Sequence, residues 1–396
     1  MENLFEKEMH RSTIFEDRNV LSPHYLPGHL PYREGEITKV MKVIAPALSQ
    51  KRPSNLFLYG KTGVGKTAVV KHVMEKLDET KKKYEAKVDS MYLNCRTHNT
   101  KYQVLLKLAQ RAKPNENFLG LSSTHLYEKF LEHVGGGLVF IVVLDEIDKV
   151  KDLDELMYSL TRANDDLKTG HIGLVGISNK IDFKEKLDPR SKSTLCEDEM
   201  VFAPYNAEQL SSILGDRAKE GFKKGLVSDG AISLAAAFAA QESGDARYAL
   251  RLLLKAGEFA DAEGKKVTDD YVKKARSAVE EDIVIELINT LPEHQIIVLY
   301  AIANLTAEGS KYRRLMDNGE RLLFSGEAYE GYEGLCKKWK TPARSARWFR
   351  EYLNELDMMG LITMTMSGPG IRGNTRLIKL SFPPEKVKTA AEKRFV

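Results

Sequence analysis

Hydrophobic residues follow two alternating patterns over the first half of the chain. Short apolar runs are separated by stretches in which apolar residues recur every three or four positions. The runs are typical of buried strands and the stretches of helices, so their alternation predicts a parallel sheet with helices on both faces. The strands are expected at residues 56–59, 91–94, 138–144, 172–177 and 200–202.

The periodicity becomes purely helical near Tyr205 and mixed again near Pro292. Helices expected at residues 207–221, 228–242, 246–262 and 268–291 form a small helical lid. Beyond the lid, helices are expected at residues 293–305, at 326–338 and from Thr341, followed by strands at 361–366 and 376–382. Helices followed by a hairpin around a glycine-rich turn predict a winged helix-turn-helix.

These changes of pattern predict three domains in the 396 residues, each large enough for its own core. The expected domains are an α/β base at residues 1–204, the helical lid at 205–291 and the winged helix at 292–396. Residues 1–12 are expected to be flexible, and the charged last dozen residues are expected to be frayed.

Composition narrows the class of protein only slightly. A net charge of +4 is too small to name a partner by itself. The three cysteines are scattered without a C-x-x-C pair, which is typical of reduced thiols. The sequence contains no run of about 18 apolar residues, and its acidic N-terminal residues do not resemble a signal peptide. We therefore expect a cytoplasmic protein with no membrane association.

A phosphate-binding motif follows the first strand. Gly60–Thr67 reads GKTGVGKT, which matches G-x-x-x-x-G-K-[ST], and a helical pattern begins directly after it. Glycines let the backbone approach phosphate oxygens, and a helix N-terminus turns its free N–H groups toward them. Lys66 is expected to reach the β- and γ-phosphates, and the Thr67 hydroxyl to bind Mg²⁺. The residues expected to hold a nucleoside triphosphate here are Thr62, Gly63, Val64, Gly65, Lys66 and Thr67.

Polar residues end the third and fourth strands, at the edge of the sheet where the phosphate loop lies. Asp145 is expected to hold Mg²⁺, directly or through water, and Glu146 to polarise the attacking water. Asn179 follows the fourth strand and could bond that water or the γ-phosphate, although Ser-Asn after a strand is by default a turn. Arg190 and Arg247 are isolated arginines, which are usually solvated, but a triphosphate site can recruit such charges.

The C-terminal pattern favours contact with DNA. Thr341-Pro342 reads as a helix start, and basic residues gather at that end of the helix while acids come later. Such a helix suits the major groove, and arginines on the following hairpin suit a backbone or minor groove. The alternative is a winged helix that binds protein, with the basic residues as a solvated face. The residues expected at DNA are Lys340, Thr341, Arg344, Ser345, Arg347, Arg372 and Arg376.

The order of these motifs resembles the AAA+ ATPases: the phosphate loop, then the D-E and S-N strands, D-P-R, and G-D-A-R. The resemblance implies Walker A at Gly60–Thr67 and Walker B at Asp145 and Glu146. Asn179 would be sensor 1 and Arg247 the lid-borne sensor 2. Arg190 would be an arginine finger that acts on the nucleotide of a neighbouring subunit.

More narrowly, the sequence is similar to archaeal origin-recognition initiators, relatives of the eukaryotic origin recognition complex and its helicase-loading partner. The matching stretches are LPYRE at residues 30–34, YGKTG at 59–63, NCR at 94–96, PYNAEQL at 204–210, GDARYAL at 244–250 and YLNEL at 352–356. The resemblance implies ATP or ADP with Mg²⁺ as cofactors. It also implies nucleotide contacts by Tyr32, Arg33, Tyr205 and Arg217, and a DNA-contacting helical insertion at about residues 96–114.

The function expected from this resemblance is that of a replication initiator. The protein would bind double-stranded origin DNA sequence-specifically, together with other initiator subunits, and help load the replicative (minichromosome maintenance type) helicase. Mg²⁺-dependent ATP hydrolysis would be slow and would act as a switch, and the protein would be associated with the nucleoid. Two alternatives remain at this stage. One is a Holliday-junction-type AAA+ motor, and the other is a nucleotide-switched signalling protein whose winged helix binds protein.

Overall fold

The computed structural model describes residues 13–180, 183, 185, 187–195, 197–308, 315–317, 320–366 and 376–395. The chain forms two compact units, Met1–Lys273 and Lys274–Val396, and the boundary falls within helix α11 (Asp269–Thr290). Each unit has its own hydrophobic core. The predicted domain boundaries at residues 204/205 and 291/292 stay predictions.

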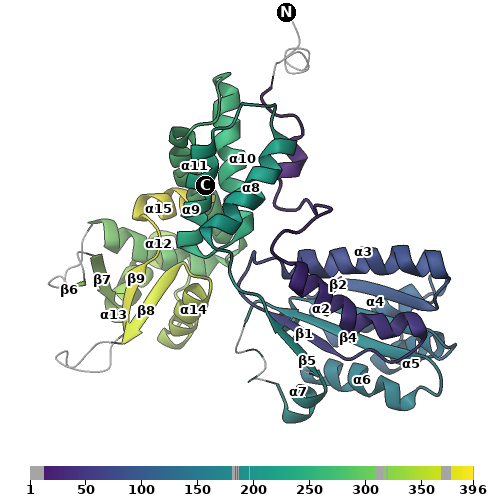
Figure 1. Cartoon of the computed structure of the whole chain (residues 1–396). Coiled ribbons are helices and arrows are strands. Elements are labelled where there is room, and N and C mark those ends of the chain that lie inside the picture. Colours follow the sequence, from purple (N-terminus) through teal and green to yellow (C-terminus); the bar gives the residue numbers. More distant parts are fainter. Residues whose placement is uncertain are drawn as a thin grey trace, which may run out of the picture. The chain divides into compact units, whose positions relative to one another are not determined.

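A five-stranded parallel sheet forms the centre of the first unit (Figure 1). Its strands are β1 (Leu56–Tyr59), β2 (Val88–Asn94), β3 (Val139–Asp145), β4 (His171–Ser178) and β5 (Asp198–Val201), in the order β2-β3-β4-β1-β5. The register pairs Tyr59 with Ser178 and Asp145 with Ile177. The carboxyl ends of β1, β4 and β3 therefore lie side by side at one edge, as the polar residues after these strands require.

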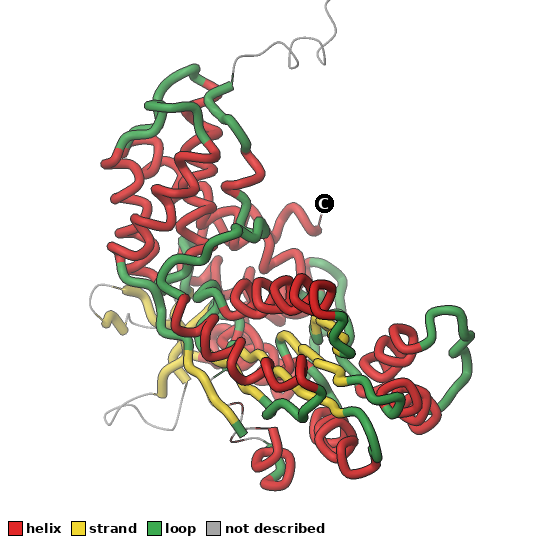
Figure 2. The backbone as a smooth tube through the Cα atoms, turned by 45° about the vertical axis from the view of Figure 1, so that its right-hand side comes forward, coloured by secondary structure: helices red, strands yellow, loops and turns green. Residues whose placement is uncertain are grey.

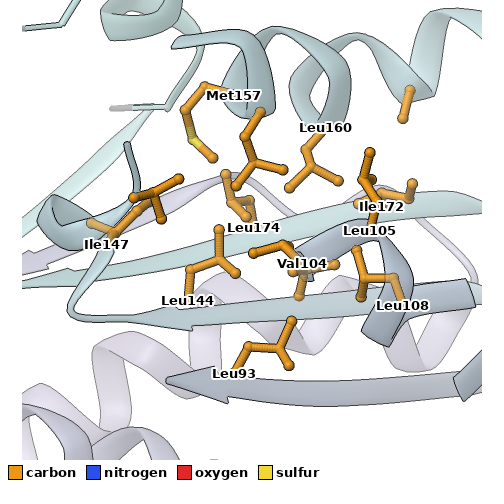
Figure 3. Close-up of a cluster of buried hydrophobic side chains, with 14 of the residues drawn as sticks. Leu93, Val104, Leu105, Leu108, Leu144, Ile147, Met157, Leu160, Ile172 and Leu174 are labelled. Atoms are coloured by element: carbon orange, nitrogen blue, oxygen red, sulfur yellow. The ribbon is translucent and has the colours of Figure 1, made fainter. Parts of the chain in front are cut away.

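Helices cover both faces of this sheet, as predicted. Along β3, Val139, Ile141 and Val143 pack in one hydrophobic cluster with α2 (Glu34–Ile44) and α3 (Lys66–Tyr84). The intervening residues pack in a second cluster on the other face, as the two-residue period of a strand dictates. That face carries α4 (Lys101–Ala112), α5 (Ser123–Val134) and α6 (Leu153–Asp166). Figure 3 labels side chains of this second cluster: Leu93, Val104, Leu105, Leu108, Leu144, Ile147, Met157, Leu160, Ile172 and Leu174.

The predicted helical lid is present in the first unit as α8 (Ala207–Gly221), α9 (Asp229–Glu242), α10 (Ala246–Ala262) and the start of α11. Figure 2 shows it as a bundle of helices without strands. The starts of α8, α9 and α10 have side-chain caps: Asn206 forms a capping box with Gln209, and Ser228 and Asp245 cap α9 and α10. The short 3₁₀ helices Arg18–Leu21, Ala45–Ser49 and Ile147–Lys149 and helix α7 (Pro189–Leu195) complete the unit.

The second unit has the predicted helix-turn-helix followed by a two-stranded wing. Its helices are α12 (Glu293–Glu308), α13 (Ser325–Lys338), α14 (Ala346–Met358) and α15 (Pro384–Phe395). Its strands β6 (Leu315–Asp317), β7 (Glu320–Phe324), β8 (Ile362–Met366) and β9 (Arg376–Leu380) form an antiparallel sheet in the order β6-β7-β9-β8. The expectation of a frayed C-terminus is wrong: Val387, Ala390 and Ala391 form one buried stripe of α15 against the core.

The predicted start of the recognition helix at Thr341 is also wrong, because Thr341 closes the preceding helix. Lys340 adopts the left-handed conformation at φ 55°, and the N–H of Thr341 donates to the carbonyl of Cys336 at 3.0 Å. The N–H of Lys340 also donates to the carbonyl of Lys337, at 3.3 Å. These two hydrogen bonds form a Schellman cap. The next helix, α14, begins at Ala346 with Ser345 as its N-cap, so Arg344 precedes it.

No helix in the part of the chain that the structure describes is long and apolar enough to cross a membrane.

Candidate functional site

The phosphate loop connects β1 to α3, and two of its glycines are required by the backbone. Gly63 has φ 73°, and a Cβ atom there would lie 1.7 Å from a carboxylate oxygen of Asp245. Gly65 has φ 95° and is the N-cap of α3, and a Cβ there would lie 2.9 Å from the Tyr205 hydroxyl. A side chain at either position would be strained and would collide with the lid. The loop can therefore present backbone N–H groups at close range to phosphate oxygens.

Lys66 lies buried at the start of α3 with its three donors engaged. Its Nζ donates to the carbonyls of Gly60 and Lys61 at 2.8 and 2.7 Å, and to Asn179 Oδ1 at 2.9 Å. Burial lowers the pKa of Lys66 to about 8, and the charge of Arg247 acts in the same direction. An incoming phosphate would replace at least one of these acceptors. The structure thus brings Lys66, Asn179 and Arg247 together, as the sequence predicted.

Asp145, at the end of β3, accepts three hydrogen bonds. Thr67 Oγ1 donates to Asp145 Oδ2 at 2.7 Å, and the Glu146 N–H donates to Oδ1 at 2.9 Å. Glu146 itself has φ 53°, a conformation that non-glycine residues rarely adopt outside turns and functional sites. The third donor is the Tyr92 hydroxyl, at 2.6 Å from Oδ2. The Thr67 hydroxyl and the Asp145 carboxylate are hard oxygen ligands side by side, so this donor set fits Mg²⁺.

The lid reaches the phosphate loop through the first residues of α10. The Ala246 N–H donates to the Gly63 carbonyl at 3.2 Å. Asp245 Oδ1 accepts the N–H groups of Arg247 and Tyr248 at 2.6 and 3.3 Å, which caps the helix. Because the cap fixes this turn, Arg247 lies directly beside the phosphate loop. The G-D-A-R motif therefore forms the start of a helix whose first residues face the phosphate site.

A cavity of about 570 Å³ adjoins the loop. Among the predicted residues, its lining includes Gly63, Gly65, Thr67, Tyr205, Arg217 and Arg247. The rest of one wall is the segment 23–31, which the sequence did not identify as functional. The spacing of Pro23, Pro27 and Pro31, which predicts an extended segment, was the available signal.

Arg217 fastens this N-terminal segment to the lid. Its guanidinium donates to the carbonyls of Val20 and Tyr25 at 3.1 and 3.3 Å and lies 4.7 Å from the centroid of the Tyr25 ring. Burial lowers the pKa of Arg217. Arg217 therefore lines the cavity and also holds the N-terminal segment in place as one of the cavity's walls.

Arg33 supports the loop from behind and does not line the cavity. Its side chain is buried, donates to the Val64 carbonyl at 3.0 Å and the Ala203 carbonyl at 2.7 Å, and stacks 4.0 Å from the Tyr205 ring centroid. Tyr32 is exposed and, like Arg33, is absent from the cavity lining.

Three further residues of the predicted nucleotide site lie outside the hydrogen-bonded side chains around Lys66 and Asp145. Val64 is buried in the hydrophobic core beneath the loop, whereas Thr62 is exposed on the loop. Arg190 is exposed at the start of α7 and does not line the cavity.

The basic residues of the winged helix form a second candidate site. Lys340, Arg344 and Arg347 are exposed around the turn before α14 and its first residues. The backbone N–H of Arg344 donates to Tyr332 Oη at 3.0 Å, and its side-chain Nε lies 3.3 Å from His294 Nε2. Burial and the charge of Arg344 lower the pKa of His294, which favours the neutral imidazole that can accept this bond.

Other predicted DNA residues take structural roles or lie outside the described residues. Arg376 Nη1 donates to Asn354 Oδ1 at 2.8 Å, which ties β9 to α14. Thr341 Oγ1 lies 3.4 Å from Glu293 Oε1. Arg372 falls in the part of the wing outside the described residues. The predicted insertion at about residues 96–114 contains α4, which packs against α5, and its Arg111 is paired with Asp89 at 3.0 Å.

Comparison with known sequence families agrees with each part of the fold. Residues 49–182 match the family described as "AAA domain", residues 211–277 the "Cdc6 AAA+ ATPase-type lid domain", and residues 286–390 the "CDC6, C terminal winged helix domain". These matches confirm the predicted fold class, an AAA+ P-loop α/β domain followed by a helical lid and a C-terminal winged helix-turn-helix domain.

Individual relatives match over almost the full length. The ORC1-type DNA replication protein of Thermococcus onnurineus is 40% identical, covering 98% of this chain and 93% of the relative. That of Pyrococcus horikoshii is 41% identical, with 98% and 92% covered. Among solved structures, the ORC1 protein of Aeropyrum pernix in complex with DNA superimposes with a TM-score of 0.84 at 37% identity, covering 97% of this chain and 98% of that one.

Proposed function

This chain belongs to the archaeal family of ORC1-type DNA replication proteins, and on that premise we propose that it is an ATP-regulated replication initiator. It binds origin duplex DNA sequence-specifically, acts in the cytoplasm at the nucleoid, and helps load the replicative helicase together with other initiator subunits. Its membership of the AAA+ ATPases supports ATPase activity. Hydrolysis is slow and serves as a switch between two states of the protein.

The observation that carries the proposal is that one chain holds both a phosphate site and a winged helix with exposed basic residues. At the phosphate loop, the side chain of Lys66 is hydrogen-bonded to Asn179, and that of Thr67 to Asp145. A separate unit carries exposed basic residues before and at the start of α14. The Aeropyrum pernix relative was solved with DNA, which supports the same ligand for this winged helix.

We assign the roles at the nucleotide from the contacts already described. Lys66 and Arg247 bind the phosphates, and Tyr205 with the segment 23–31 receives the base in the adjoining cavity. Thr67 and Asp145 hold Mg²⁺, which would neutralise charge on the phosphate oxygens when bound. Glu146 orients the attacking water, and Asn179 holds the water or the γ-phosphate. Arg190 remains an arginine finger for a neighbouring subunit, which its exposed position permits.

Protection of random genomic fragments by the full chain, with and without ATP, followed by sequencing tests the proposal. We expect a small set of protected sequences whose protection changes with ATP, and no effect of ATP on the Lys66→Ala variant. Protection without sequence preference would contradict sequence-specific origin binding. A closed hexamer with rapid, DNA-stimulated turnover would favour the branch-migration motor, and an absence of duplex affinity would favour the signalling switch.

A further inference from the structure

Tyr92 contacts the carboxylate to which we assign Mg²⁺. Its hydroxyl donates a hydrogen bond of 2.6 Å to Asp145 Oδ2, the same oxygen that accepts the hydrogen bond of 2.7 Å from Thr67. The other oxygen, Oδ1, accepts the Glu146 N–H. Two of these three donors belong to the motifs that the sequence identifies, but Tyr92 comes from a different strand, β2.

The sheet register directs Tyr92 to this position. Tyr92 pairs with Val143 of β3, and Asp145 lies two residues further along that strand. Because strand side chains alternate, Tyr92, Val143 and Asp145 project from the same face, toward α3. The Tyr92 ring packs against the hydrophobic cluster beneath α3, and Lys71 Nζ of that helix lies 4.9 Å from the ring centroid. The Tyr92 ring therefore lies between strand β2 and helix α3.

The Tyr92 hydroxyl is the donor in its hydrogen bond to Asp145. An ionised carboxylate only accepts hydrogen bonds, so the direction of this bond is fixed.

We propose that Tyr92 is a positioning residue that orients Asp145 for Mg²⁺, an inference that rests on the proposed function. Mg²⁺ requires near-octahedral geometry, so the direction of the carboxylate oxygens decides how well Asp145 serves it. Two donors on Oδ2 and one on Oδ1 hold the carboxylate against rotation about its Cβ–Cγ bond. Without the Tyr92 hydroxyl, Oδ2 keeps one donor, and the carboxylate can turn. Loss of such outer partners typically costs about 10- to 100-fold in metal affinity or activity.

The test is the variant Tyr92→Phe, which removes one oxygen and keeps the ring. Calorimetry would measure ATP affinity of the full chain in excess Mg²⁺ and in EDTA. We expect equal affinities of wild type and variant in EDTA, and a gain in affinity from Mg²⁺ that is about tenfold smaller in the variant. The Mg²⁺ concentration for half-maximal hydrolysis should rise about tenfold, with turnover at saturating Mg²⁺ nearly unchanged. If Tyr92 only supported the fold, the substitution would change the affinity in EDTA and the affinity in Mg²⁺ by the same factor.

Tyr127→Phe is the matched control, because the Tyr127 hydroxyl also meets a carboxylate, Asp166 at 3.2 Å, away from the phosphate loop. We expect it to leave the Mg²⁺ dependence unchanged. If Tyr92→Phe lowers stability, the ratio of affinities with and without Mg²⁺ still reports the site, since the folded fraction cancels. An unchanged ratio in Tyr92→Phe would overturn the inference. Failure of the wild type to bind ATP in either condition would instead refute the proposed function.

Discussion

At the residue scale, Lys66 is the buried cation of the phosphate loop. The side chain is removed from water, and its ammonium is bonded by three acceptors, of which only Asn179 is a side chain. Burial and the nearby Arg247 both oppose the charged form, which is why the pKa of Lys66 falls to about 8. Polyanionic phosphates would favour the charged ammonium and so oppose both effects. Nucleotide binding should therefore be linked to protonation of Lys66.

We expect ATP affinity in Mg²⁺ to fall about tenfold between about pH 7 and pH 9, because a group with a pKa of about 8 loses its proton across that range. The sign follows from the shift: the free protein has the lowered pKa and the complex a higher one, so binding takes up a proton at alkaline pH. Calorimetry in buffers of different ionisation enthalpy measures that uptake. Lys66→Met should bind more weakly and without this uptake. A constant wild-type affinity over this range would show that Lys66 does not meet the phosphates.

At the scale of elements, the sequence predicted best where apolar periodicity and a capping residue agree. Helices α8 and α10 begin and end where expected, because Asn206 and Asp245 mark their starts. Strand β1 is likewise bounded as predicted, by its buried run and the glycine that follows. The first residues of α14 were misassigned because a Thr-Pro pair is typical of a helix start. The preceding left-handed residue, Lys340, is not visible as a pattern in the sequence.

The parts of the site that the sequence missed come from tertiary packing. Tyr92 and the segment 23–31 belong to elements outside the phosphate-loop and D-E motifs, and no spacing rule connects them to Asp145 or Gly65. Only the strand order and the docking of the lid bring them to one place. Short strands such as β6 were missed because they contain too few residues for a two-residue period to appear.

Lys340→Gly should stabilise the end of α13 by about 1 kcal/mol, because glycine adopts the left-handed conformation at φ 55° without steric cost. Lys338→Gly is the matched control: it removes the same charge from a helical position and should destabilise by about 1 kcal/mol. Hydrogen exchange of the α13 amides in the full chain measures both. The same direction of change in the two variants would contradict the Schellman cap.

At the scale of the whole molecule, the two kinds of site differ in how they are built. The nucleotide site is formed from the sheet edge and lid of one compact unit, and its Lys66 and Asp145 are buried and hydrogen-bonded. The basic residues near the start of α14 are exposed and lie in the other unit. Buried charges respond to local protonation, whereas exposed charges respond to ionic strength. Salt should therefore separate DNA binding from nucleotide binding.

We expect the affinity for duplex DNA to fall steeply with salt, and Arg344→Ala with Arg347→Ala to reduce the slope of log affinity against log salt by about 2. Each arginine that contacts a phosphate displaces close to one counterion, so two lost contacts change the slope by that amount. Lys223→Ala with Lys224→Ala removes the same charge from exposed positions after α8 and should leave the slope unchanged. Fluorescence anisotropy of labelled duplex at several salt concentrations gives the slopes. If both double variants lowered the slope equally, net charge and not the winged helix would account for DNA binding.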